Sequence, residues 1–188
     1  MNQERLNEEE KKELLKLSRK TLENYYLNGR IFEYTPVNPR LIDLHLGCFV
    51  TLKKKGNLRG CLGNFSSRDP LYLNIQKMTI SSAKEDPRFE PVKQSELSDI
   101  DIEISVIYPM IKIRNIDEIL VGRDGLYVEH GFFRGVLLPQ VATEYGWDRE
   151  EFLSHTCIKA GLPPNAWKDM EIKIFRFEAD VFGEKDHK

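Results

Sequence analysis

The stretch GCFVTLKKKGNLRGCLGNF, residues 47–65, decides the fold of this chain. Two runs that favour strands flank Lys55-Gly56-Asn57, where glycine and asparagine tolerate the positive φ angles of a tight turn. The pattern therefore predicts a β-hairpin. We expect the functional site of the protein on the second strand of this hairpin.

Side-chain alternation gives that second strand two faces of different chemistry. The even-numbered positions from 58 to 62 hold leucine or glycine and should face the core. The other face places the thiol of Cys61 beside the guanidinium of Arg59, and a nearby cation favours the reactive thiolate. Gly60 and Gly63 flank the thiol and let backbone or a ligand approach closely.

The composition is that of a soluble globular protein without a strong charge bias. Of 188 residues, 40% are hydrophobic and 31% are charged, and the formal net charge is −2. This balance argues against nucleic acid as a partner. No apolar run approaches the ~20 residues that cross a bilayer, and the polar, acidic N-terminus resembles neither a signal peptide nor a transit peptide. We expect a cytoplasmic protein that does not bind membranes.

The cysteines and the absent motifs restrict the chemistry. Cys48, Cys61 and Cys157 are an odd number without CxxC spacing, which argues against a disulfide framework or a cysteine-rich zinc site. Cys48 and Cys157 share the apolar faces of their elements and should be core residues. Neither a phosphate-binding GxxxxGK[ST] loop nor GxGxxG, HExxH or GxSxG occurs. The sequence predicts no metal and no cofactor.

Helical and strand periods alternate along the rest of the chain. The expected helices cover residues 8–28, 71–84, 115–120, 140–145 and 148–160, and the expected strands outside the hairpin cover residues 100–108, 126–129, 132–138 and 170–182. Hairpin links outnumber regular βαβ crossovers. This order is typical of an α+β fold with a mainly antiparallel sheet flanked by helices.

Several polar residues have two interpretations that the sequence leaves open. Glu103 is a general base or a carboxylate on a solvated strand face. His155 is a surface residue or a base that activates Cys61. Asp86 is a turn residue in a loop that Phe89 fastens to the core, or part of the site.

Four blocks of the sequence carry a family resemblance. Leu58–Gly63, LRGCLG, resembles the LRGCIG signature of the AMMECR domain family, also called AmmeMemoRadiSam system protein A. The other blocks follow in family order: Ser82-Ala83 with Asp86-Pro87-Arg88-Phe89, then Asp101–Val106, and then Leu137–Ala142 followed by Trp147 and Cys157–Leu162. The single departure in the signature is Leu62 for isoleucine, which conserves volume.

The resemblance implies one AMMECR-type domain over residues 1–188. It has two closely packed lobes, a larger αβ lobe and a smaller lobe formed by non-contiguous segments. Members lie near Memo-like and radical-SAM proteins in microbial genomes, which implies a shared pathway but no known reaction. The positions of His155 and Cys157 differ in animal relatives, which leaves Cys61 and Arg59 as the better candidates.

The leading hypothesis is an enzyme, or an enzyme accessory, that binds a small anionic ligand. Arg59 holds the anion, the backbone N–H groups of Gly60 and Gly63 line the pocket, and Cys61 is the nucleophile or redox-sensitive thiol. The remaining polar lining is predicted to comprise Asp86, Arg88, Gln140 and His155.

Two other hypotheses compete with it. In the first, the protein is a non-catalytic module that docks a Memo-like or radical-SAM partner through Arg59, Phe65 and Phe89. In the second, a local patch formed by Lys53–Lys55, Arg59 and Arg68 binds RNA, against which the acidic overall charge counts.

Overall fold

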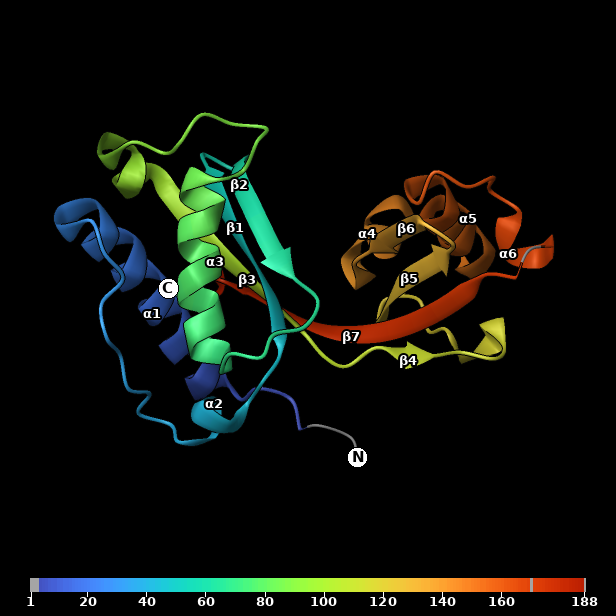
Figure 1. Ribbon diagram of the computed structural model, residues 1–188, viewed down its shortest axis with the longest axis horizontal. Helices are drawn as coiled ribbons and strands as arrows, with labels where there is room; N and C mark the ends of the chain where they lie inside the picture. Colours follow the sequence, from blue (N-terminus) through green and yellow to red (C-terminus); the bar gives the residue numbers. More distant parts are fainter. Residues whose placement is uncertain (1–3, 170, 188) are drawn as a thin grey trace. The chain divides into compact units, whose positions relative to one another are not determined.

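The computed structural model describes residues 4–169 and 171–187, and the chain divides into two compact units (Figure 1). Unit 1 comprises the described parts of Met1–Ile107 and Asp180–Lys188, and unit 2 comprises the described parts of Tyr108–Ala179. The larger unit is discontinuous in sequence, because the last long strand leaves unit 2 and ends in unit 1.

Unit 1 is built on the predicted hairpin, which is confirmed. Strands β1 (Gly47–Lys54) and β2 (Asn57–Asn64) pair antiparallel, and β3 (Ile100–Ile107) pairs antiparallel with the other side of β1. The turn has positive φ at Lys55 and at Gly56, whereas Asn57 begins β2. β2 therefore lies at the edge of the sheet.

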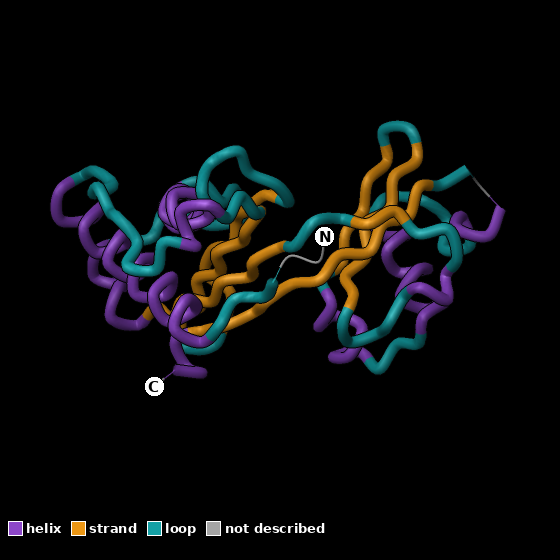
Figure 2. Tube along the Cα trace, turned by 90° about the horizontal axis from the view of Figure 1, so that it is seen from below, coloured by secondary structure: helices purple, strands orange, loops and turns teal. Residues whose placement is uncertain are grey.

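Helices cover one face of this sheet (Figures 1 and 2). Helix α3 packs on β1 and β2, and helix α1 packs on α3 and β3. Asn7 and Glu10 form a capping box at the start of α1, and Gly29 ends it in the left-handed conformation. The helical segments of unit 1 are α1 (Glu8–Asn28), α2 (Arg40–Asp43), α3 (Leu71–Lys84), η1 (Gln94–Asp99) and η3 (Glu184–His187).

The strands of unit 2 pair antiparallel and pack on a hydrophobic core of their own. Its strands are β4 (Ile111–Lys112), β5 (Asp124–His130), β6 (Phe133–Leu137) and β7 (Lys173–Gly183), of which β7 continues into unit 1. Its helical segments are η2 (Ile116–Glu118), α4 (Pro139–Tyr145), α5 (Arg149–Lys159) and α6 (Ala166–Asp169). Strand β5 lies between β6 and β7, and the buried face of α5 supplies Phe152, Leu153 and Cys157 to the core.

The α+β class with an antiparallel sheet is confirmed. None of the described helices is both long and apolar enough to cross a bilayer. Leu58, expected in the core, is 43% exposed at the start of β2, next to the hairpin turn. The expected start of the last strand at Met170 lies outside the described residues, and the strand is observed from Lys173.

Candidate functional site

The sheet of unit 1 has a second face, which points away from α3. Val50, Leu52 and Ile102 are almost fully buried, so the residues that alternate with them project to the opposite side. The register aligns Thr51 with Cys61 on β2 and with Glu103 on β3. We call Cys61, Thr51 and Glu103 the polar row.

Cys61 is the half-buried cysteine of the three. The hydroxyl of Thr51 donates a hydrogen bond to its Sγ at 3.2 Å. Cys48 and Cys157 are fully buried, and burial raises the pKa of each of those thiols. The structure thus places one thiol at a polar surface and two in the cores of their units.

The predicted anion holder, Arg59, is bonded to groups of its own chain. Its Nη2 and Nε donate to the two carboxylate oxygens of Glu96 at 3.0 and 3.2 Å, and its Nη1 donates to the carbonyl of Glu90 at 2.8 Å. Arg59 first, and Lys54 second, lower the pKa of Glu96 to about 2. On the polar face itself, the ammonium of Lys53 binds the carboxylate of Glu103 at 2.8 Å.

Asp86 and Arg88 form hydrogen bonds with the backbone of Cys61 at the edge of the sheet. The N–H of Cys61 donates to Asp86 Oδ2 at 2.8 Å, and Arg88 Nη2 donates to the carbonyl of Cys61 at 3.2 Å. Arg88 also donates to both Asp86 oxygens, at 2.9 and 2.7 Å, and this pairing is the first cause that holds the pKa of Asp86 well below its usual range. We call Asp86 and Arg88 the edge clamp. It satisfies the two backbone groups that an edge strand leaves open beside the thiol.

The signature glycines allow close packing between backbones. A Cβ on Gly60 would lie 2.1 Å from the carbonyl oxygen of Ser82 on α3, and one on Gly63 would lie 2.3 Å from the carbonyl oxygen of Cys48. The hydroxyl of Ser82 bridges the two strands, since it donates to Val50 at 2.7 Å and accepts from the N–H of Leu62 at 2.8 Å. These contacts fix β2 against α3 whether or not a ligand binds.

Comparison with known proteins decides the family. The AMMECR1 family model matches residues 15–182. The chain belongs to the AMMECR1 family.

Relatives of similar length support this assignment. A protein of Methanothermobacter thermautotrophicus is 45% identical over 185 residues, which cover 95% of this chain and 96% of the relative. A protein of Thermococcus onnurineus is 46% identical, over 92% of this chain and 89% of the relative. A crystal structure of an uncharacterized protein from Pyrococcus horikoshii has a TM-score of 0.81 at 42% identity, over 92% of this chain and 90% of that one.

Two residues predicted for this AMMECR1 site, Gln140 and His155, belong to unit 2. Gln140 lies in the first turn of α4, and its Oε1 is buried without a hydrogen-bond partner among the described residues. The exposed ring of His155 stacks on Trp147, with centroids 3.8 Å apart and planes inclined by 4°. Trp147 in turn stacks on Tyr145. A role for Gln140 or His155 beside Cys61 stays a prediction.

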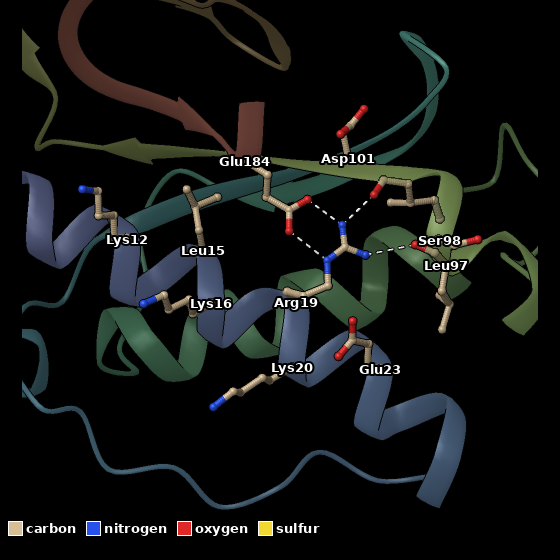
Figure 3. Close-up of a pocket in the computed structure, with 11 residues that line it drawn as sticks. Lys12, Leu15, Lys16, Arg19, Lys20, Glu23, Leu97, Ser98, Asp101 and Glu184 are labelled. Carbon is tan, nitrogen blue, oxygen red and sulfur yellow. Dashed lines mark hydrogen bonds and ion pairs between the residues drawn. The ribbon is translucent and has the colours of Figure 1, made fainter. Parts of the chain in front are cut away.

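Unit 1 also has a groove that the sequence did not predict (Figure 3). Its volume is about 890 Å³, and one wall is the outer side of α1, with Lys12, Lys16, Arg19 and Lys20. The periodicity of α1 identifies its buried face but not this hollow, because the opposite wall comes from η1, β3 and Glu184, far away in sequence. No group of three or more histidine, cysteine or acidic residues suited to a metal ion occurs within residues 4–169 and 171–187.

Proposed function

We propose that this AMMECR1-family protein binds a small ligand at the polar row and that Cys61 is its reactive thiol. The observation that carries the proposal is the alignment of a half-buried thiol with Thr51 and Glu103 on the face that points away from α3. A lone thiol keeps its reactivity in a reducing compartment, so the proposal places the protein in the cytoplasm.

The surroundings of Cys61 support a fixed nucleophile. The edge clamp forms hydrogen bonds with both the backbone N–H and the carbonyl of Cys61. Gly60 lets the backbone of β2 pack directly against α3. Positioning of this kind is what a reacting group needs before the ligand arrives. The hydroxyl of Thr51, which donates to sulfur, stabilises a developing negative charge there.

In this proposal, Lys53 supplies the positive charge for an anionic ligand, on the sheet face that carries the polar row. Its side chain is 37% exposed and pairs with Glu103, which is itself partly exposed, so a ligand carboxylate or phosphate can exchange with that partner. Arg59 and Arg88 are each held by a carboxylate that is at most 14% exposed. In this proposal these two arginines position the strand, and Lys53 contacts the anion.

Ligand protection tests the proposal. The native protein is treated with iodoacetamide in the presence of inorganic phosphate or a short dicarboxylate, and modification of Cys61 is followed by mass spectrometry. We expect at least one of these anions to slow the modification in a saturable way, and Lys53→Gln to weaken the protection while the matched control Lys77→Gln leaves it intact. Equal modification rates with and without every anion would refute an anion site at the polar row.

A second candidate function, docking of a protein partner, has an observation of its own in unit 2. Phe132 is 98% exposed and Phe133 50% exposed at the turn between β5 and β6. Large exposed aromatic residues are frequent anchors of protein interfaces. We expect Phe132→Ser to weaken binding to a purified Memo-like or radical-SAM protein by about tenfold or more, and the control Tyr145→Ser to leave it unchanged. Calorimetry that detects no binding, or the same affinity for Phe132→Ser, would exclude this surface.

A further inference from the structure

The groove beside α1 is independent of the polar row and of the function proposed there. Its volume of about 890 Å³ lies in the range of small-molecule sites. A second hollow of about 450 Å³ lies on the same helix, and Lys12, Lys16 and Lys20 line both. The three lysines therefore form a ridge with a depression on each side, which we call the lysine ridge.

The lysine ridge carries charge that its own chain does not neutralise. Within the described residues no hydrogen bond or ion pair holds the ammonium of Lys12, Lys16 or Lys20. Among the carboxylates of the same helix, Glu10 binds Arg40 at 2.7 Å and Glu13 accepts from the hydroxyl of Tyr34 at 2.8 Å. Glu23, one turn beyond Lys20, also lines the groove and offsets one of its positive charges. Four residues of an α-helix rise about 6 Å, so the ridge offers three cations at regular steps to one elongated anion.

The opposite wall and the floor of the groove are already paired or apolar. Figure 3 shows the guanidinium of Arg19 turned to Glu184, where Nε donates to Oε1 at 2.8 Å, and to the carbonyls of Leu97 and Ile100. Asp101 is bound by Lys185 at 2.7 Å. Leu15 and Ile100 are buried beneath the groove, and Ser98 is exposed at its rim.

These features select a ligand with several negative charges and an apolar or planar body. We propose that the groove binds a nucleoside triphosphate, with the phosphates along the lysine ridge and the nucleoside over the floor formed by Leu15, Leu97 and Ile100. Polyphosphate matches a row of point charges, and a ring system matches an apolar floor with hydroxyl and carboxylate groups at the rim. A single phosphate would meet only part of the row.

Calorimetric titration of the full chain with ATP tests the proposal. The triple variant Lys12→Gln, Lys16→Gln, Lys20→Gln should bind at least about tenfold more weakly. The control Lys11→Gln, Lys77→Gln, Lys84→Gln removes the same charge from α1 and α3 outside the groove and should bind as the parent does. Cys61→Ser should also bind normally, which separates this site from the polar row.

A further variant distinguishes a site from general attraction to a cationic helix. Ser98→Trp fills the groove without changing charge and should weaken ATP binding more than it weakens binding of inorganic triphosphate. The absence of ATP binding at millimolar concentration, an equal loss in both triple variants, or a Ser98→Trp variant that weakens the binding of ATP and of inorganic triphosphate by the same factor would each overturn the proposal.

Discussion

At the scale of single residues, the signature around Cys61 combines packing with positioning. Gly60 is required because the carbonyl of Ser82 occupies the space of a side chain. Arg59 is drawn to Glu96 and the carbonyl of Glu90, so its charge is satisfied within unit 1. The sequence placed thiol and guanidinium on one strand face, as alternation requires. It did not reveal the partner of Arg59, because Glu96 lies in a 3₁₀ segment that carries no helical period.

The ion pair of Glu96 makes a prediction about pH. Its pKa of about 2 in the folded protein lies below the value of ~4.3 for an unfolded glutamate. The pair therefore stabilises the fold above about pH 4.3, and this contribution is lost as the pH falls toward 2. We expect Glu96→Gln to lower the free energy of unfolding at pH 7 by about 1 to 3 kcal/mol and by roughly half as much at pH 3.

Urea denaturation at the two pH values measures this difference. Glu9→Gln, an exposed substitution on α1, is the control and should change stability little at either pH. A loss of stability for Glu96→Gln that is the same at pH 3 as at pH 7 would show that the carboxylate charge does not stabilise unit 1.

At the scale of elements, β2 is held by groups that are distant in sequence. Its pairing with β1 follows from the local turn and from the alternating pattern, and both were predictable. The edge clamp and the bridge made by Ser82 join residues more than fifteen positions apart. The family resemblance marked these positions as a block, but only the structure shows that they support the strand that carries Cys61.

Removal of the Ser82 hydroxyl tests how β2 is anchored. Ser82→Ala leaves the carbonyl of Val50 and the N–H of Leu62 without their shared bridge. An unsatisfied buried polar group costs about 1 to 3 kcal/mol, so we expect destabilisation of that size and faster hydrogen exchange at Leu62. Ser81→Ala, the neighbouring position on α3, is the matched control. Unchanged exchange at Leu62 in Ser82→Ala would mean that β1 and β2 close without the bridge.

At the scale of the whole molecule, the α+β class and the two hairpins were predictable from periodicity and turn residues. The division into units was not, because it depends on β7, which reads as one long strand in the sequence but belongs to both units. The groove beside α1 could not be predicted either, since its walls come from three separate stretches of the chain. Sequence patterns identify elements and buried faces well, and surfaces assembled from distant segments poorly.

Alkylation of the three cysteines tests in one experiment whether Cys61 is a reactive thiol. The native protein is treated with iodoacetamide at pH 7.5 and the rate at each cysteine is followed by mass spectrometry, with Thr51→Val and the exposed control Thr143→Val alongside. We predict that Cys61 reacts first and that Cys48 and Cys157 react only as their units unfold. Thr51→Val should slow the reaction at Cys61, because it removes the hydroxyl that donates to the sulfur, and Thr143→Val should not. Modification of Cys61 as slow as that of Cys48 and Cys157 would contradict the account, because the thiol would then be a packing group.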